Sequence, residues 1–377
     1  MKLYLNRGVS PNILLCNIIG HWPFGNPMIY KIYTHFVMTG MYLYNLAGTM
    51  YLVKNIDDTE EATATIYNLL STVAVIIKAN IFHRNFKQIK SIVDMFKIEE
   101  FQPRNDEQCK LLKSGVFVAR FVFFYFFITA DLTLVMWISF PILDKERRLP
   151  SKAWFPYDYL SEEYYMPTYI WQSIFICYHA LSNVGMDTLF AMLMVQTGAQ
   201  CDALNEELSN LGKENSNDSE AVHQDLRRCI LHHKLILDLC DSIGLAFGNI
   251  VFVQFVTSVL VLCETMFLLS LLNTFNATFV MLLFYQIAIF TQIFLYCWFG
   301  NEVVLKSEKL HYSAFMCNWY ECSQPFKKDL LFFMTRVRKP IILFVGNIFP
   351  ITLMTFTSIL RSSWAYFMAL RKVHDKS

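Results

Sequence analysis

Hydrophobic residues recur along the chain in seven long stretches separated by polar connections. A helix needs roughly 20 mostly apolar residues to cross a bilayer, and each stretch meets that length. The stretches cover residues 28–53, 62–82, 115–140, 168–197, 244–272, 276–301 and 343–370. The pattern predicts an all-α membrane protein with seven transmembrane helices.

Lysine and arginine are unevenly distributed over the connections between these stretches. The N-terminus and the connections 83–114, 198–243 and 302–342 carry 20 of them, whereas the alternate set of connections and the tail carries 8. Basic connections tend to stay in the cytoplasm. We therefore expect a cytoplasmic N-terminus and an extracellular C-terminus, which is the reverse of a G-protein-coupled receptor.

The long inner connections have helical patterns of their own. Leu226, Cys229, His233 and Ile236 fall on one apolar face. We expect spans four and five to continue as helices beyond the bilayer, with a turn at 210–219. The inner segments can then pack into a cytoplasmic helical anchor bundle.

The last hydrophobic stretch has two unlike faces when it is placed on a helix. Bulky residues lie on one side: Leu353, Phe356, Leu360, Trp364 and Phe367. Small and hydroxyl residues form a narrow stripe on the other: Thr355, Ser358, Ser362, Ala365 and Ala369. A helix surrounded by lipid has no use for hydroxyl groups in register. The stripe indicates a helix that faces water, and it is a candidate pore wall.

Composition agrees with a membrane protein. Hydrophobic residues make up 55% of the chain and charged residues 17%, against about 25% charged residues in soluble domains. The net charge of +1 gives no indication of a nucleic-acid partner. The chain contains no HExxH, GxSxG or P-loop motif, so neither an enzyme nor a cofactor is expected.

Neither cysteine nor histidine predicts a cross-link or a metal site. The ten cysteines fall in spans or in inner segments, where no disulfide framework is expected. His223, Cys229, His232 and His233 match no standard zinc spacing. We expect this cluster to be a solvated helix face that holds no metal.

Charged residues within the apolar stretches need partners. Each would cost roughly 2.5–3.5 kcal/mol at the bilayer centre. For Asp131, Asp187 and Glu264, pairing between helices is favoured over transport chemistry. The longest outer connection, 141–167, is rich in Trp and Tyr, and a belt at the membrane interface is favoured there over a lid on a pocket.

Several short motifs in the C-terminal third resemble the insect odorant receptor family. In chain order they are Tyr312-x5-Asn318-Trp319-Tyr320, Arg338-Lys339-Pro340, Phe349-Pro350-x5-Phe356 and Trp364-Ala365-Tyr366-Phe367-Met368-Ala369-Leu370. Gly20-His21-Trp22-Pro23 is similar to the family's N-terminal element. The length and the Phe-Pro form resemble a ligand-tuned receptor more than the odorant co-receptor. The Thr-Tyr-x5-Gln-Phe ending of gustatory receptors is absent.

The resemblance implies a subunit of a tetrameric, non-selective cation channel that assembles with the co-receptor. The last helix would line the pore, with an outer gate at Ala369 and Val373 beside Lys372. Asn318, Trp319, Tyr320 and Pro340 would belong to the subunit anchor. The implied location is the plasma membrane of an olfactory neuron dendrite.

The resemblance also implies an odorant pocket in the outer half of spans two, three, four and six. A small, volatile, hydrophobic ligand would bind there mainly by apolar burial. The candidate residues are Tyr67, Ser71, Thr133, Met136, Trp137, Tyr169, Ser173, Ile176, Cys177, Phe279, Leu282 and Leu283.

Together these inferences divide the chain into five parts. The N-terminal segment and spans one to four with the ligand pocket take 1–197, the anchor helices 198–243, and spans five and six 244–301. A second anchor segment takes 302–342, and the pore helix and tail 343–377. The alternatives are a metabotropic receptor coupled to a G protein, a gustatory receptor channel, and a structural or transporter protein.

Overall fold

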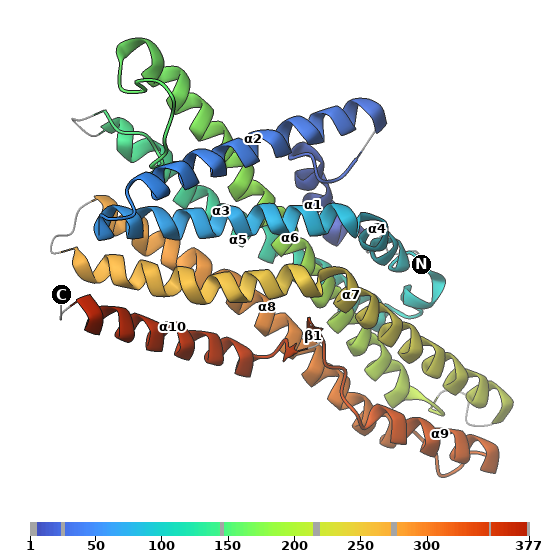
Figure 1. Ribbon diagram of the computed structural model, residues 1–377. Coiled ribbons are helices and arrows are strands. Elements are labelled where there is room, and N and C mark those ends of the chain that lie inside the picture. Colours follow the sequence, from blue (N-terminus) through green and yellow to red (C-terminus); the bar gives the residue numbers. More distant parts are fainter. Residues whose placement is uncertain are drawn as a thin grey trace.

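The computed structural model describes residues 6–23, 27–143, 147–213, 219–272, 277–346 and 348–374. Over these residues the chain is almost entirely helical (Figure 1). Seven helices among the described residues cover the predicted spans: α2 (Pro27–Lys54), α3 (Thr59–Arg84), α5 (Asp106–Leu143), α6 (Glu162–Asn210), α7 (Ser219–Leu271), α8 (Ala277–Phe315) and α10 (Leu353–His374). The predicted all-α fold is confirmed.

The remaining elements are short. They are α1 (Asn6–Ile18), α4 (Phe86–Met95), the 3-10 turn η1 (Glu99–Phe101), α9 (Gln324–Val337) and the two-residue strands β1 (Phe344–Val345) and β2 (Phe349–Pro350). Among the described residues, α3, α5, α7 and α8 are long and apolar enough to cross a membrane by length and composition alone.

The last hydrophobic stretch is not one helix from its beginning. Phe344–Val345 and Phe349–Pro350 pair as antiparallel strands, and α10 starts only at Leu353. Proline lacks the backbone N–H that a helix interior needs, so Pro350 excludes a helix through this point. Gly346 has a φ of 55°, which side-chain-bearing residues rarely adopt. These two residues explain why the expected helix from 343 is shorter at its start.

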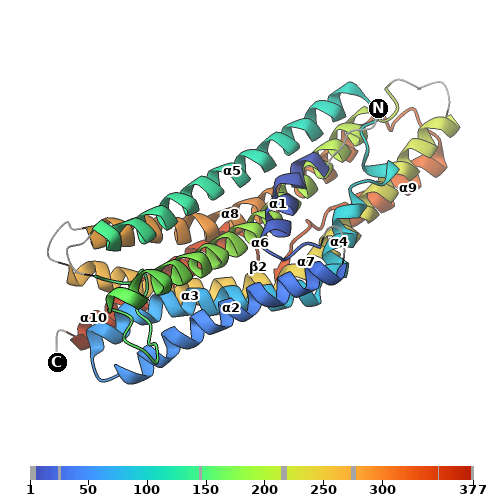
Figure 2. The ribbon, with the colours of Figure 1, turned by 90° about the horizontal axis from the view of Figure 1, so that it is seen from above.

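Helix α6 is the centre of the bundle. It contacts α1, α2, α3, α5, α7 and α8, and Figure 2 shows it between α5 on one side and α2 and α3 on the other. Every residue from Val184 to Cys201 is buried. Small residues allow this close approach: a Cβ on Gly115 of α5 would lie 2.7 Å from the Ala199 side chain. Close packing around α6 therefore organises the fold.

The predicted extensions of spans four and five beyond the apolar stretches are present. α6 continues to Asn210 and α7 begins at Ser219, while part of the expected turn, 214–218, lies outside the described residues. Figure 1 shows the ends of α6, α7 and α8 gathered with α9, away from the C-terminus. Leu226, Cys229 and Ile236 are fully buried in this part of the molecule. The expected apolar face of α7 thus packs against its neighbours.

The histidine cluster of α7 is not the solvated face that its spacing suggested. His223, His232 and His233 are all at least nine-tenths buried. His232 Nε2 lies 3.0 Å from Gln200 Oε1 of α6, and His223 Nε2 lies 2.8 Å from an Asp329 oxygen of α9. One ring nitrogen of His223 and one of His232 thus bond to neighbouring helices, and the His233 ring packs edge-on against Phe333 of α9. Such partners allow histidine to occupy a buried face.

Candidate functional site

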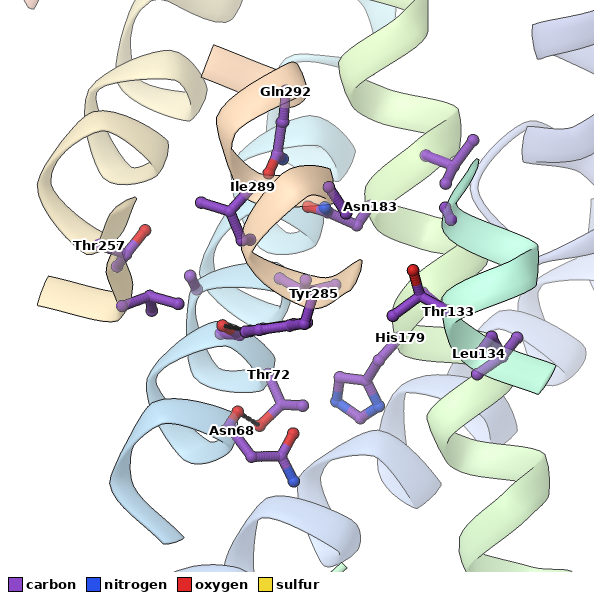
Figure 3. Close-up of a pocket in the computed structure, with 18 of the residues that line it drawn as sticks. Asn68, Thr72, Thr133, Leu134, His179, Asn183, Thr257, Tyr285, Ile289 and Gln292 are labelled. Atoms are coloured by element: carbon purple, nitrogen blue, oxygen red, sulfur yellow. Dashed lines mark hydrogen bonds between the residues drawn. The ribbon is translucent and has the colours of Figure 1, made fainter. Parts of the chain in front are cut away.

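A cavity of about 150 Å³ lies between α3, α5, α6, α7 and α8. Figure 3 shows side chains from these helices converging on it, with Tyr285 of α8 between two polar ends. One end contains Asn183 and Gln292, and the other contains Asn68, Thr72 and His179. The walls between them are mainly apolar. Such a space is typical of a site for a small organic ligand.

Three polar side chains that line one end of the cavity, Asn183, Gln254 and Gln292, are hydrogen-bonded to a buried ion pair that does not line it. Together these five side chains from four helices form what we call the lysine cluster: Lys78, Asn183, Asp187, Gln254 and Gln292. Lys78 forms an ion pair with Asp187, and both side chains are almost completely buried. Lys78 Nζ also donates to Asn183 Oδ1 at 2.6 Å and to Gln254 Oε1 at 2.8 Å. The Gln292 side-chain amide donates to Asp187. A buried charge pair is tolerated only when its other hydrogen-bonding positions are satisfied, as they are here.

Pairing between helices was favoured for three acidic residues within the apolar stretches, and the structure shows it for one of them. Asp187 pairs between helices, as favoured by the sequence. Asp131 is exposed on the surface of the bundle. Glu264 is half-buried, and no ion pair to it is found within the described part of the chain.

At the opposite end of the cavity, lining side chains are hydrogen-bonded to the connection between α5 and α6. Ser151 is buried and bonds back to the bundle: its backbone N–H donates to Gln172 Oε1 at 3.1 Å, and its hydroxyl accepts from Tyr44 at 2.6 Å. Asn68 Nδ2 donates to the same hydroxyl at 3.0 Å, and Trp137 Nε1 donates to Pro150 O at 2.8 Å. Both Asn68 and Trp137 line the cavity. The connection is thus bonded to two side chains of the cavity wall, and we call its described residues 147–161 the lid. These contacts do not decide between a belt at the membrane interface and a lid on a pocket, so both stay predictions.

Four of the twelve odorant-pocket candidates line the cavity, namely Ser71, Thr133, Trp137 and Ile176. Tyr67 and Leu282 lie one layer further out, where the Tyr67 ring packs against Trp137. Leu283 is exposed on the outside of the bundle. The other five do not line the cavity: Met136, Tyr169, Ser173, Cys177 and Phe279.

Sequence reasoning missed the deeper half of the cavity and the contribution of α7. Helical periodicity could have found part of it, because Ala180, Asn183 and Val184 follow Ile176 one and two turns along α6. On α7, the polar residues Gln254 and Ser258 stand four apart in an otherwise apolar span, and that spacing was the available signal. The main residues missed are Asn68, Thr72, Val75, Leu134, His179, Asn183, Gln254, Thr257, Ser258, Tyr285, Ile289 and Gln292.

The predicted pore face of α10 is largely uncovered in the single subunit. The residues of this face that are exposed are Ser358, Ser362, Ala365, Ala369, Lys372 and Val373. Thr355 differs, because it is buried and its hydroxyl donates to Pro350 O at 2.6 Å. The opposite side packs on the bundle, where the Phe356 ring contacts Phe290 and Phe294 of α8. Trp364, expected among the packed residues, is 57% exposed.

The anchor candidates lie near the inner end of α8. Asn318 donates its backbone N–H to Leu211 O at 3.0 Å and thereby connects the ends of α8 and α6. Trp319 and Tyr320 are exposed, and Pro340 is half-buried between α9 and β1. Asn318 thus acts within the subunit, whereas the two aromatic residues are available to a neighbour.

The 7tm odorant receptor family model matches residues 58–364, which is most of the chain. The chain belongs to the odorant receptor family. Odorant receptor Or1 of Anopheles gambiae is 25% identical over 365 residues, covering 89% of this chain and 87% of that protein. Odorant receptor 46a, isoform A, of Drosophila melanogaster is 23% identical over 367 residues, covering 95% of this chain and 96% of that protein.

The fold is that of a solved odorant receptor. The insect olfactory receptor OR5 from Machilis hrabei, in complex with eugenol, superimposes with a TM-score of 0.87 at 18% identity, covering 98% of this chain and 99% of that chain. A second structure of the same receptor gives a TM-score of 0.86 at 18% identity. The odorant receptor described here is accordingly a membrane protein with the seven-helix fold of insect olfactory receptors.

Proposed function

We propose that this odorant receptor is a ligand-tuned subunit of a non-selective cation channel, and that odorant binding in the cavity opens a pore lined by α10. The observation that carries the proposal is the combination of two features in one subunit. A cavity of ligand size lies among α3, α5, α6, α7 and α8, and the small, polar face of α10 is left without a cover.

The channel requires other subunits, because one α10 helix provides only one wall. We propose that the odorant co-receptor supplies the rest in a heterotetramer. Trp319, Tyr320, Leu331 and Phe332 support this assembly, because they are large, exposed side chains at the inner end of the molecule. Exposed apolar residues gathered in one region are typical of a protein contact. The assembly would lie in the plasma membrane of an olfactory neuron dendrite.

Ligand binding opens the pore only if the open state binds the ligand more tightly than the closed state. Two-electrode voltage clamp, with this chain alone, the co-receptor alone and both together, tests the proposal on a panel of volatiles. We expect ligand-evoked cation current only when both are present. Absence of any evoked current despite surface expression of both chains would contradict it.

Membrane orientation separates the channel from a metabotropic receptor. Epitope tags on intact cells should be accessible at the C-terminus and inaccessible at the N-terminus. An accessible N-terminal tag would contradict the proposed orientation and favour the G-protein-coupled alternative.

The gate is tested at Ala369, which is exposed near the end of α10. Ala369→Trp should reduce the current while surface expression is unchanged, because a large ring would project into the pore. Met368→Trp is the matched control: Met368 is also exposed but lies about 100° around the helix. Unchanged permeation in Ala369→Trp would remove this residue from the gate.

A further inference from the structure

The directions of the hydrogen bonds in the lysine cluster follow from the chemistry of Lys78. An ammonium group only donates, so the oxygens of Asn183 and Gln254 must face it. The nitrogen of Gln254 then donates to Gln292 Oε1 at 3.1 Å. This leaves the nitrogen of Gln292 to donate to Asp187. One buried cation therefore fixes the orientation of three side-chain amides.

In this arrangement every side-chain amide oxygen of the cluster accepts a hydrogen bond, whereas one amide nitrogen has no acceptor among the described residues. The side-chain oxygens of Asn183, Gln254 and Gln292 each receive a hydrogen bond. No described residue accepts from Asn183 Nδ2. Asn183 is half-buried and lines the cavity, whereas Gln254 and Gln292 are buried. Figure 3 shows Asn183 pointing from α6 toward α8 across this end of the cavity.

Most hydroxyl groups along the walls already donate to another group and are not free to donate to a ligand. Thr133 donates to Thr129 O at 3.0 Å and Thr257 donates to Val253 O at 2.8 Å. Ser71 donates to Tyr67 O at 3.2 Å, so the Tyr285 hydroxyl in contact with it must be the donor of that pair. The hydroxyls of Ser71, Thr133, Thr257 and Tyr285 are thus occupied by backbone carbonyls or by each other. The Ser258 hydroxyl is almost fully buried and accepts from Gln254 Nε2 at 2.9 Å.

Charge and size limit the ligand further. Lys78 and Asp187 neutralise each other, so the cavity offers no counter-ion to a charged ligand. A volume of about 150 Å³ equals that of an engineered protein cavity that holds benzene. The occupant is therefore an uncharged molecule of about the size of a substituted six-membered ring.

We propose that the cavity selects small uncharged molecules carrying a hydrogen-bond acceptor oxygen, in particular ketones and aldehydes, and that Asn183 Nδ2 donates to that oxygen. This rests on the proposed function, in which the cavity is the odorant site. Asn183 is a specificity-determining residue because Lys78 holds its amide with the nitrogen presented to the ligand. An alcohol could instead donate to Asn68 Oδ1 at the far end, so a carbonyl isolates the role of Asn183.

The test uses pairs of ligands that differ only in this oxygen. Acetophenone and α-methylstyrene have nearly the same shape, and so have cyclohexanone and methylenecyclohexane, but only the ketones accept a hydrogen bond. Binding is measured by the rise in unfolding temperature of the purified chain, and response by current in cells that also express the co-receptor. For at least one pair we expect about a tenfold lower half-maximal concentration for the ketone, the effect of roughly one net hydrogen bond.

Two variants remove the donor. Asn183→Leu and Asn183→Ala should bring the ketone-to-alkene ratio close to one, while Lys78 keeps Asp187 and Gln254 as acceptors. Thr257→Val is the matched control, because it removes a wall hydroxyl that already donates to the backbone, and its ratio should stay at the wild-type value. The wild-type ratio needs no variant, so the test remains decisive if both Asn183 variants fail to fold.

Equal potency within every pair, or binding of neither member, would overturn the proposal. A wild-type ratio retained in Asn183→Leu or Asn183→Ala would also overturn it. Ketone-selective binding without any current would uphold the specificity of the cavity while contradicting the channel function. Current evoked equally by ketones and alkenes would uphold the channel function while contradicting the specificity of the cavity.

Discussion

The two halves of α6 are packed in different ways. From Thr168 to Asn183 buried and half-exposed residues alternate along the helix, and the cavity opens beside it. From Val184 to Cys201 every residue is buried. The same helix therefore borders a ligand-sized space at one end and a close-packed core at the other. Recognition needs space that the protein leaves unfilled, whereas assembly needs helices in firm contact.

Small residues contribute to this difference at the contacts of α6 with α1 and α5. In the packed half, Gly185 lies against Cys16 of α1, and Ala199 lies against Gly115 of α5. In the cavity half, aromatic rings stand between the helices: Trp137 and Tyr285 have centroids 5.7 Å apart. Small residues bring helices together and large rings hold them apart. The lysine cluster lies at the boundary between the halves.

The largest expected effect comes from removing the cation at this boundary. Lys78→Met leaves Asp187 buried and unpaired, which should lower the free energy of unfolding by about 3–5 kcal/mol. Unfolding of the purified protein in detergent and its surface level in cells measure the loss. The double variant Lys78→Met/Asp187→Leu should recover most of it, and a double variant as unstable as Lys78→Met would show that the charge is not the cause.

The comparison between the halves is tested directly with two leucines. Leu193 is fully buried in the packed half, and Leu134 lines the cavity. Leu193→Ala should cost about 2–5 kcal/mol, because it creates a void in a filled core. Leu134→Ala enlarges a space that already exists and should cost about half as much. Equal losses of unfolding free energy would contradict the difference in packing.

Acid should lower the free energy of unfolding through His232 of α7, which bonds to Gln200 in the packed half of α6. Burial lowers the pKa of His232 from its usual 6.5 to about 3. Below pH 6.5 the unfolded chain binds a proton that the folded chain does not, so stability is complete above pH 6.5 and falls as the pH drops toward 3. The expected slope is about 1.4 kcal/mol per pH unit.

His232→Asn removes this titration and can still donate to Gln200. Its unfolding temperature should therefore change less than that of the wild type between pH 7 and pH 5. Burial also lowers the pKa of His233 to about 4, so His233→Asn should flatten the profile independently. Wild-type slopes in both variants would exclude these histidines as the source.

The smallest effect is expected at the lid. Tyr44→Phe removes one hydrogen bond to Ser151 and should cost about 1 kcal/mol. Hydrogen exchange of residues 147–161 should become faster, because the lid opens more often. Tyr42→Phe is the control, since Tyr42 bonds to Asn80 and not to the lid. Equal exchange in the two variants would show that Tyr44 does not hold the lid closed.

The number and order of the spans could be predicted because a helix in a bilayer needs a long apolar stretch. The start of α10 could not, since hydropathy alone does not register the break that Pro350 and Gly346 impose. The outer rim of the cavity was predicted through Ser71, Thr133 and Trp137. Its depth was not, because which turn of a helix faces a space depends on how neighbouring helices cross.

The lysine cluster could not be predicted from the sequence for the same reason. Lys78 and Asp187 are both charged residues within predicted spans, but they are 109 residues apart in the chain. Nothing local connects two such residues, and only the packing of α3 on α6 makes them a pair. The orientation of Asn183, and with it the predicted preference for a carbonyl, follows from that packing.

The β1–β2 hairpin holds the start of α10 in place, so that a tilt of the helix moves its far end most. Ile351 just before α10 is fixed by a backbone bond to Leu343 O at 2.9 Å, and it presses so closely on α8 that a Cβ on Gly300 would lie 2.5 Å from it. When α10 tilts about this fixed point, the displacement of a residue grows with its distance from Ile351. Ala369 is about 24 Å along the helix from Leu353, so a tilt of about 5° moves it by about 2 Å. A small rearrangement near the hairpin is thus enlarged where the pore would be narrowest.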